Sequence, residues 1–509
     1  MSFLKINNLS VDYKMRRETV YAAKNVNIEV SKGEILGLVG ESGSGKSTVG
    51  NAIINLIDEP GKVSNGSIVL DGINIHENLE KIFKYRGKKI GLIFQDPQTS
   101  LNPILTIGEQ LIETIQTHLN LTKEEAKIKA TDLLKEVGIK DADNRFNNYP
   151  HQFSGGMRQR VVISLALCCE PELLIADEPT TALDVSIQSQ ILELIKKLTK
   201  ERNLAVILIT HDMGVIAETT DRVAVMKNGN LVEIGPTKDI LTKPNEIYTK
   251  SLVSSVPPTN KKIQRFKIIE KENKSQSSTN IKILKRWNKK EILSQDLVEI
   301  NNLKKTFDDN FFTESTKNSV MAVDDVSFKI KEGESFGLVG ESGSGKSTIA
   351  KMIVNLYKPS SGDINFDNVC ITKIKNNNEM MKFRKQIQMI FQDPYSSLNG
   401  RLKVKDIVSE PIKLHNPSIS SKDLDDYIFD LLESVELTQR SADRYPHEFS
   451  GGQRQRISIA RAIATQPRLL VCDEPTSALD VSIQAQILNL LKDLQEQLNL
   501  TILFISHDL

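Results

Sequence analysis

Short apolar runs that end in small or polar residues recur along the chain and predict buried strands. Ile35–Val39 leads into a glycine-rich turn and then a helix-like segment, and Ser335–Val339 does the same. Leu173–Ala176 ends in two carboxylates, and Leu204–Ile209 is followed by Thr-His-Asp. Continuous apolar runs of this kind are typical of the buried strands of a parallel sheet. Because helix-like segments alternate with them, the pattern predicts an α/β fold.

The same patterns occur twice and in the same order. Gly37–Thr48 reads GLVGESGSGKST, and Gly337–Thr348 repeats these letters at an offset of 300. Asp177–Leu192 matches Asp473–Leu488 at 14 of 16 positions, at an offset of 296. The chain therefore contains two copies of one domain. We place them at residues 1–256 and 297–509.

The range 257–296, between the copies, is predicted to be a basic flexible linker. Residues 257–291 contain 11 Lys or Arg and 3 Asp or Glu, a net charge of +8 (11 − 3). A solvated tether is the favoured interpretation, and contact with anionic lipid or RNA is the alternative. The first copy continues past His211 into an apolar run and turn that are typical of a closing β-hairpin. The second copy reaches Leu509, the last residue of the sequence, two residues after His507. We therefore expect the second domain to be truncated after this histidine.

Charge and composition exclude several classes of protein. The 509 residues include 66 Lys or Arg and 65 Asp or Glu, so the net charge of +1 creates no overall attraction to nucleic acid or membrane. The apolar runs are shorter than the ~20 residues of a membrane span, and the start lacks the apolar segment of a signal peptide. The four cysteines have no paired spacing, which excludes a disulfide framework. These features predict a soluble intracellular protein.

Each glycine-rich turn has the spacing and context of a phosphate-binding loop. Glycines allow the backbone to approach phosphates closely, and successive N–H groups at a helix N-terminus attract anions. The lysine would contact the β- and γ-phosphates, and the serine hydroxyl after it would bind Mg²⁺. The loop residues are Gly40, Glu41, Ser42, Gly43, Ser44, Gly45, Lys46, Ser47 and Thr48 in the first copy, and Gly340, Glu341, Ser342, Gly343, Ser344, Gly345, Lys346, Ser347 and Thr348 in the second.

Two adjacent carboxylates end a second apolar run in each copy. Asp177 and Asp473 would hold the metal through water, and Glu178 and Glu474 would polarise the water that attacks the γ-phosphate. A pair of carboxylates at the end of a buried strand is costly without a cation nearby, which favours a metal-nucleotide site over a merely capped strand.

Together these motifs resemble the ATP-binding-cassette (ABC) ATPases. The resemblance implies two P-loop NTPase domains of that type, each with a mainly parallel sheet core, an antiparallel β subdomain and a helical subdomain. It implies signature loops that bind the γ-phosphate held by the other domain, so that Lys46 would face Ser450 and Lys346 would face Ser154. The signature loops begin with Ser154, Gly155 and Gly156 in the first copy and with Ser450, Gly451 and Gly452 in the second.

The resemblance also assigns the remaining nucleotide contacts. Gln95 and Gln392 would sense Mg²⁺ and the attacking water, and His211 and His507 would be the switch histidines. Ala182–Asp184 and Ala478–Asp480 match the D-loops, whose aspartates, Asp184 and Asp480, belong to the nucleotide site. Tyr13 and Phe307 are the candidates for stacking on adenine. ATP and Mg²⁺ are thus the expected cofactors.

Within that family the chain resembles importer ATPases for oligopeptides, dipeptides and nickel. The Ser-Leu-Asn sequence after each Gln-Asp-Pro, the Tyr-Pro-His before each signature, and the tail at Tyr248–Pro257 are similar to that group. The first copy looks like a D-type subunit and the second like an F-type subunit. The implied partners are two integral-membrane permeases and an extracytoplasmic substrate-binding protein, without nucleic acid, at the cytoplasmic face of a bacterial membrane. The two cassettes would pair within one chain.

Two alternatives from other classes are weaker. A soluble tandem cassette that acts on ribosomes also has a linker between two halves, but it typically carries Asn-His-Leu-Asp where this chain has Thr-Ala-Leu-Asp and Ser-Ala-Leu-Asp. A DNA-repair or chromosome ATPase would need zinc cysteines or a long coiled-coil insertion, and the sequence between Ser47 and Ser154 has no sustained heptads.

Overall fold

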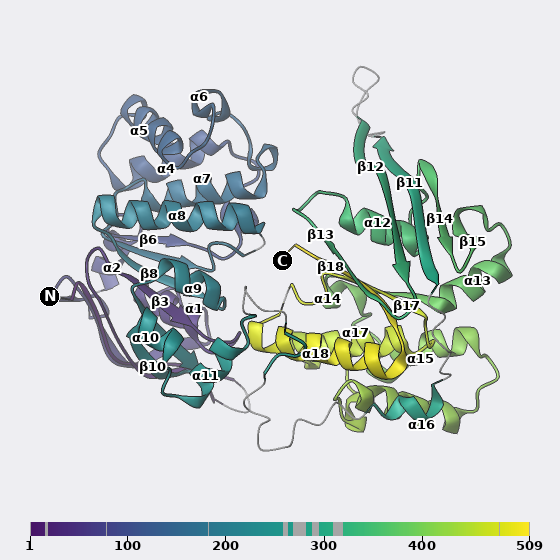
Figure 1. The fold of residues 1–509 in the computed structure, drawn as a ribbon. Coiled ribbons are helices and arrows are strands. Elements are labelled where there is room, and N and C mark those ends of the chain that lie inside the picture. The colour runs from purple at the N-terminus through teal and green to yellow at the C-terminus, as the bar shows by residue number, and fades with distance from the viewer. Residues whose placement is uncertain are drawn as a thin grey trace. The chain divides into compact units, whose positions relative to one another are not determined.

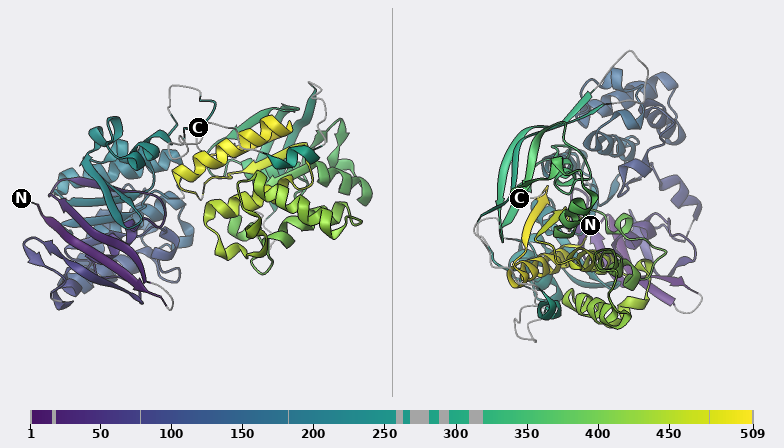
Figure 2. Two further views of the ribbon diagram at one scale, coloured as in Figure 1. Left: turned by 90° about the horizontal axis from the view of Figure 1, so that it is seen from below. Right: turned by 90° about the vertical axis from the view of Figure 1, so that its right-hand side faces the viewer.

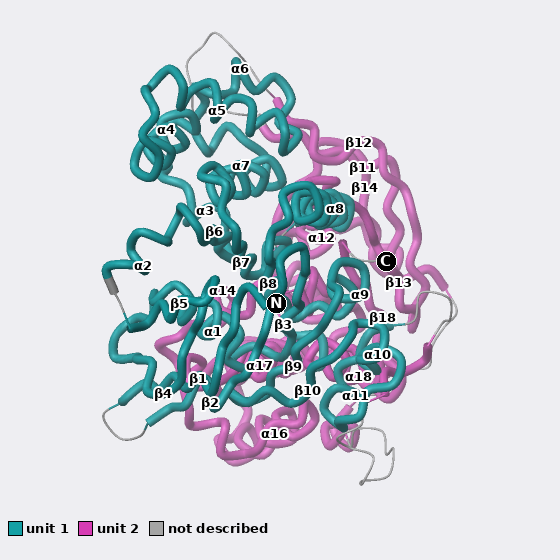
Figure 3. Tube along the Cα trace, turned by 90° about the vertical axis from the view of Figure 1, so that its left-hand side faces the viewer, with its two compact units in different colours: residues 1–258, 480–482 teal, residues 259–479, 483–509 magenta. Residues whose placement is uncertain are grey.

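The computed structural model describes residues 2–15, 19–77, 79–181, 183–257, 263–267, 281–287, 295–308, 319–477 and 479–507. The chain divides into two compact units: residues 1–258 with 480–482, and residues 259–479 with 483–509 (Figure 3). Unit 1 and unit 2 are described separately below.

Unit 1 is built on one mixed sheet (Figure 1). Its strand order is β5-β4-β1-β2-β10-β9-β3-β8-β7-β6. The strands are β1 (Leu4–Lys14), β2 (Thr19–Val30), β3 (Ile35–Val39), β4 (Gly61–Leu70), β5 (Ile73–Asn74), β6 (Ile90–Ile93), β7 (Leu173–Asp177), β8 (Ala205–Thr210), β9 (Arg222–Lys227) and β10 (Asn230–Pro236).

The sheet of unit 1 has a parallel part and an antiparallel part. β9, β3, β8, β7 and β6 are parallel neighbours, and their apolar residues are buried on both faces, as the sequence pattern predicts. β1 pairs antiparallel with β2 and β4 in the long purple strands of Figure 2. Left-handed Asn8 (φ 48) and Asn25 (φ 49) lie where the register between β1 and β2 shifts. β9 and β10 connect the two parts, because β10 pairs with both β9 and β2.

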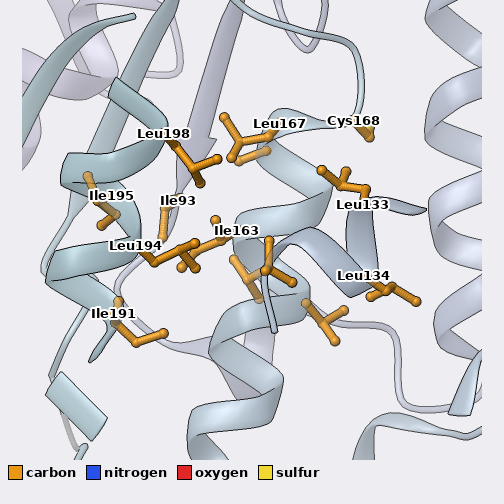
Figure 4. Close-up of a cluster of buried hydrophobic side chains, with 14 of the residues drawn as sticks. Ile93, Leu133, Leu134, Ile163, Leu167, Cys168, Ile191, Leu194, Ile195 and Leu198 are labelled. Atoms are coloured by element: carbon orange, nitrogen blue, oxygen red, sulfur yellow. The ribbon is translucent and has the colours of Figure 1, made fainter. Parts of the chain in front are cut away.

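Helices cover the parallel part and form a separate helical portion. They are α1 (Lys46–Ile53), α2 (Leu79–Tyr85), α3 (Pro97–Ser100), α4 (Ile107–His118), α5 (Lys123–Glu136), α6 (Ala142–Arg145), α7 (Gly155–Leu167), α8 (Val185–Arg202), α9 (Met213–Thr219), α10 (Thr237–Thr242) and α11 (Ile247–Ser254). One buried cluster joins α5, α7 and α8 to the sheet: Leu133, Ile163 and Leu198 pack with Ile93 of β6 (Figure 4). This packing fixes the start of α7 relative to the sheet edge.

Unit 2 repeats this architecture with one difference. Its strands are β11 (Asp296–Asp308), β12 (Ser319–Lys331), β13 (Ser335–Val339), β14 (Ser361–Phe366), β15 (Val369–Cys370), β16 (Ile387–Ile390), β17 (Leu469–Asp473) and β18 (Thr501–Ser506). They form two separate four-stranded sheets, β12-β11-β14-β15 and β13-β18-β17-β16. No described strand of unit 2 corresponds to β9 or β10, the strands that join the two parts in unit 1. Among the described residues β13 is the edge strand of its sheet, and Val339 is exposed where its counterpart Val39 is buried.

The helices of unit 2 are α12 (Lys346–Ile353), α13 (Asn377–Gln386), α14 (Pro394–Ser397), α15 (Val404–His415), α16 (Ser421–Ser434), α17 (Gly451–Ile463) and α18 (Val481–Leu498). The α/β expectation, with a parallel core, an antiparallel part and a helical part in each copy, is confirmed.

The range 257–296 differs from the expected tether in its described parts. A short 3-10 helix, η3 (Lys282–Arg286), contacts α16, and Ile281 and Ile283 are buried in the core of unit 2. Upstream, Arg265 forms ion pairs with Asp493 and Glu496 of α18. The basic composition of this range predicts a solvated chain. The burial of its short apolar segment stabilises the bound conformation by more than the conformational entropy that the segment loses on ordering.

Candidate functional site

In unit 1 the glycine-rich loop, the paired carboxylates, the histidine and the glutamine of the motifs lie at one edge of the parallel sheet. β3 ends at Val39, directly before the glycine-rich loop, and β7 ends at Asp177. His211 directly follows β8, and Gln95 is the second residue after β6. The carboxyl ends of parallel strands share an edge, so residues up to 171 positions apart (211 − 40) meet there.

The glycine-rich loop surrounds its own lysine. The buried Lys46 ammonium donates to the carbonyl oxygens of Gly40 (2.7 Å) and Glu41 (2.9 Å) and approaches Ser44 Oγ at 3.5 Å. Burial lowers the pKa of Lys46. Helix α1 begins at this lysine, so its first backbone N–H groups open toward the loop. The result is a preformed positive site at a helix N-terminus, suited to a polyphosphate.

The loop serine is linked to the first carboxylate. Ser47 Oγ donates to Asp177 Oδ1 at 3.1 Å. Burial is the main reason that the pKa of Asp177 is raised, although the hydrogen bond from Ser47 opposes the shift. A hydroxyl and a carboxylate oxygen at this distance are the donors that Mg²⁺ prefers. Thr48 is the next residue of α1.

The second carboxylate is held by three side chains. Glu178 Oε1 is 2.9 Å from His211 Nδ1, and Glu178 Oε2 accepts from Gln95 Nε2 at 2.8 Å. Thr181 Oγ1 also donates to Oε2, at 2.9 Å. Glu178 itself adopts a left-handed backbone (φ 46), a strained conformation for this residue that turns its carboxylate away from the path of β7.

These contacts set the charge of the Glu178–His211 pair. Burial opposes charge on both groups, but the hydrogen bond and the electrostatic attraction between them outweigh it. The pKa of Glu178 is therefore lowered and the pKa of His211 is raised. The pair favours a carboxylate beside a protonated imidazole.

Unit 2 reproduces the arrangement within a few tenths of an ångström in most contacts. Lys346 Nζ donates to Gly340 O (2.6 Å) and Glu341 O (2.8 Å). Ser347 Oγ donates to Asp473 Oδ1 at 2.9 Å. Glu474, again left-handed (φ 46), accepts from Gln392 Nε2 at 2.7 Å, and His507 Nδ1 lies 3.5 Å from its Oε2. The pKa of Glu474 is lowered chiefly by the hydrogen bond from His507.

Each signature loop starts a buried helix. Ser154 Oγ accepts from the N–H of Met157 at 3.4 Å at the start of α7, and Ser450 Oγ accepts from the N–H of Gln453 at 3.4 Å at the start of α17. Gln453 also returns a bond, because its Oε1 accepts from the N–H of Ser450 at 3.1 Å. The Met157 side chain has no such oxygen. The first turn of the helix after the expected signature loop is therefore capped by two hydrogen bonds in unit 2 and by one in unit 1.

The expected D-loop aspartates and adenine-stacking rings are not in contact with the glycine-rich loop of their own unit through any interaction described here. Asp184 and Asp480 precede the long helices α8 and α18, whereas Ala182 and Ala478 lie outside the described residues. Tyr13 is half-buried against the core of the antiparallel part. Phe307 is exposed and meets Tyr357 edge-on with ring centroids 5.5 Å apart. Neither ring contacts a glycine-rich loop through an interaction that the structure gives, so their roles stay predictions.

Two residues near the site were not singled out for it from sequence. Thr181 binds Glu178, as described above. The Tyr248 hydroxyl in α11 accepts from the N–H of Glu41 at 3.2 Å and so links a distant helix to the loop. The adjacent threonines after Glu178-Pro179 were a possible signal for Thr181, but the family-like tail that starts at Tyr248 gives no sign that this residue contacts the loop.

Outside these clusters the described residues offer few other candidate sites. No group of three or more His, Cys, Asp or Glu side chains in the described ranges could hold a metal ion. The four cysteines are free thiols. Among the described helices, none combines the length and the apolar character needed to cross a bilayer.

Comparison with known proteins gives matches over nearly the whole chain. A family model described as ABC transporter matches residues 23–181 and 323–477. A model described as oligopeptide/dipeptide transporter, C-terminal region, matches residues 232–282.

Similar proteins are found among curated sequences and solved structures. The chain is 42% identical over 519 aligned positions to the glutathione import ATP-binding protein GsiA of Escherichia coli (strain K12), which covers 99% of this chain and 82% of that relative. The protein of the same name from Shigella flexneri is also 42% identical, with the same coverage. A dimeric ATP-binding cassette, MJ0796, bound to ADP and Pi is 34% identical, covers 46% of this chain and 98% of its own, and has a TM-score of 0.42.

Proposed function

The chain belongs to the ABC transporter family, and on that basis we propose that it is the ATP-hydrolysing subunit that energises an importer of peptides or related solutes. The family match bears out the resemblance drawn from the motifs. The cassettes of this family bind and hydrolyse ATP, which agrees with a positive loop beside a carboxylate cluster.

The observation that carries the proposal is the same four-residue arrangement in both units. In each, the loop lysine lies at the sheet edge where a glutamate is held between a glutamine and a histidine. We assign Glu178 and Glu474 to orient and polarise the attacking water as general bases. His211 and His507 would position these carboxylates and contact the γ-phosphate. Tyr13 and Phe307 remain the candidates for stacking on adenine.

The residues at the loop fit a divalent cation. Ser47 and Asp177 in unit 1, like Ser347 and Asp473 in unit 2, present hard oxygen donors linked by a hydrogen bond. Gln95 and Gln392 would complete the set. We propose that they hold Mg²⁺, which neutralises charge on the phosphates when bound. The protein's own groups would orient the nucleotide and the water.

Hydrolysis would require the two cassettes to pair. We propose that Ser450, Gly451 and Gly452 contact the nucleotide on Lys46, and that Ser154, Gly155 and Gly156 contact the nucleotide on Lys346. Asp184 and Asp480 would lie beside the nucleotides in that closed state. Closing on ATP and opening after hydrolysis would supply the movement that drives transport.

The match to the oligopeptide/dipeptide transporter region supports a peptide-class importer. The E. coli relative is named for glutathione import, and glutathione is itself a small peptide-like solute. We propose membrane permeases as partners, with an extracytoplasmic protein that delivers the solute, and a position at the cytoplasmic face of the membrane.

Affinity purification of the tagged chain from gently solubilised membranes tests this function. We expect two polytopic permeases to co-purify in proportion to the chain, together with a substrate-binding protein. The matched control is the same chain carrying Glu178→Gln, a change of nearly equal size that should keep the fold and the partners. Recovery of ribosomal proteins in place of permeases would contradict the importer assignment.

A further inference from the structure

Unit 2 contains a cavity that none of the nucleotide-binding elements lines. Its volume is about 640 Å³, within the range of small-molecule sites. Its wall includes Glu332, Arg468 and Asn499, which come shortly before β13, β17 and β18. These three strands are parallel, so their beginnings share one edge of the sheet. The glycine-rich loop and Glu474 lie at the opposite edge, and the cavity is separate from the nucleotide site.

Part of the range expected to be a tether forms one wall of this cavity. Ile283 is fully buried, and its N–H donates to Ser434 Oγ of α16 at 3.0 Å. Arg286 Nε donates to Asp430 Oδ2 at 2.8 Å, and its carbonyl accepts from Gln466 Nε2 at 3.0 Å. Three anchors within four residues therefore hold the segment against unit 2. They place Trp287, the next residue and the only tryptophan of the chain, in the cavity wall.

The cavity wall carries an excess of positive charge. Lys382 and Lys385 lie one turn apart on α13 and both line it, and neither ammonium has a carboxylate partner among the described residues. His415 at the end of α15 faces the same space, and burial and the charge of Lys385 lower its pKa. Glu332 is the carboxylate in the wall, and Arg468 pairs with it at 2.8 Å. The lysines are therefore available to an anion.

Polar and apolar groups in the wall indicate an organic ligand. Thr465 is 4% exposed, and its hydroxyl has no hydrogen-bond partner in the described structure. A buried hydroxyl without a partner is costly, and turning this hydroxyl, which neighbouring atoms now cover, toward the cavity would let a ligand atom satisfy it. Trp287 and Ile419 add apolar surface and also pack against the core of unit 2. A planar ring could pack on Trp287, and an anionic group could bind the lysines.

The first copy of the repeat carries a glutamate, Glu172, where the second carries Arg468. Thr465-Gln466-Pro467-Arg468 aligns with Cys169-Glu170-Pro171-Glu172 at the offset of 296. Gln466 and Glu170 share the same left-handed backbone, φ 55 in both. Glu172 pairs with Lys32 and Lys89 in unit 1, and Arg468 pairs with Glu332 and Asp367 in unit 2, so both residues are neutralised by ion pairs. The backbone and an ion pair are thus retained in both units, and the positive charge of the cavity wall that lacks a carboxylate partner comes from Lys382 and Lys385.

We propose that this cavity binds a small organic anion in which a planar ring is joined to a phosphate, a molecule of nucleotide size. The ring would stack on Trp287, and the phosphate would lie between Lys382 and Lys385 with the Thr465 hydroxyl as a further donor. Binding would tighten the segment 281–287 on unit 2, away from the site of hydrolysis. The proposal does not depend on ATP turnover.

Tryptophan fluorescence tests the proposal directly, because Trp287 is the chain's only tryptophan. The full chain is titrated with guanosine 5′-monophosphate, with guanosine, and with inorganic phosphate. We expect saturable quenching by the nucleotide and at least about tenfold weaker binding of guanosine, which lacks the contacts to the lysines, and of phosphate, which lacks the ring; tenfold corresponds to about 1.4 kcal/mol.

Matched variants assign the signal to the cavity. Lys382→Ala/Lys385→Ala should weaken the response at least tenfold, whereas Arg384→Ala, an exposed residue between them that does not line the cavity, should leave it unchanged. Any signal that originates at the glycine-rich loops would survive the double substitution. An unchanged response in the double variant, equal quenching by guanosine, or no saturable quenching would each overturn the proposal.

Discussion

The glycine directly before α12, in the second phosphate loop, allows a sharp test of how closely the loop packs against the neighbouring backbone. Gly345 has φ 94, and a Cβ there would lie 2.2 Å from the carbonyl oxygen of Ala322 in β12. Gly343, two residues earlier, is also left-handed (φ 79), but a Cβ there would have no heavy atom within 4 Å. Replacing each by alanine therefore separates backbone strain from collision.

The magnitudes follow from these two environments. Gly343→Ala introduces left-handed strain alone, about 1–2 kcal/mol. Gly345→Ala adds a collision with a backbone atom, because real contacts of Cβ are essentially never closer than 3.0 Å. Forced overpacking costs roughly 1–3 kcal/mol more, so the total is about 2–5 kcal/mol. At about 2–4 °C per kcal/mol for a unit of this size, Gly345→Ala should lower the melting temperature of unit 2 by roughly 4–20 °C.

Trp287 provides the assay. It belongs to unit 2 and is the only tryptophan, so its emission during thermal unfolding reports that unit alone. ATP affinity measured with a fluorescent nucleotide should fall further in Gly345→Ala than in Gly343→Ala, since the displaced loop must be restored on binding. Equal melting temperatures for the two variants would refute the reasoning that the carbonyl of Ala322 leaves no room beside the loop.

Three further predictions test other contacts. His211→Gln should destabilise unit 1 more at pH 6 than at pH 9, because a histidine with a raised pKa stabilises the fold below its unfolded value of about 6.5 and loses this effect as pH rises through the folded pKa; a pH-independent difference in melting temperature by circular dichroism would contradict the charged pair. Gln453→Met should lower the free energy of unfolding of unit 2 in urea by about 0.5–1 kcal/mol, because the bond to the N–H of Ser450 is lost. Gln453→Glu should keep that bond and cost little, and equal losses in the two variants would contradict a stabilising role of this cap. Ile283→Ala should cost about 2–5 kcal/mol because the side chain is fully buried, whereas exposed Lys285→Ala should cost almost nothing; similar melting curves followed by Trp287 emission would mean that burial does not hold the segment.

The elements that could be predicted from sequence were those with a local signature. Ile35–Val39 and Leu173–Asp177 are short apolar runs beside glycine or carboxylates, and both are strands whose ends carry the site. The repeat located the equivalent elements in unit 2. Gln95 and His211 were singled out only through the family resemblance, since a lone glutamine or histidine has no pattern of its own.

The remainder depends on contacts between distant parts of the chain. Tyr248 meets the loop backbone across 207 residues (248 − 41), and its own neighbourhood reads as an ordinary surface helix. Ile281 and Ile283 are two apolar residues within a lysine-rich stretch, where composition favours a solvated chain. Their burial depends on the surface that α16 offers, and no window of the linker sequence contains that information.

The most direct test of the account is ATP hydrolysis by the full chain with Glu178→Gln and Glu474→Gln, singly and together. The matched control is Glu193→Gln, an exposed glutamate on α8 outside the site. Because a positioned general base contributes about 100-fold or more, we expect the double variant to lose at least that much turnover while still binding ATP, with the control unchanged. Hydrolysis by the double variant at the wild-type rate would contradict the assignment of these carboxylates as the catalytic bases.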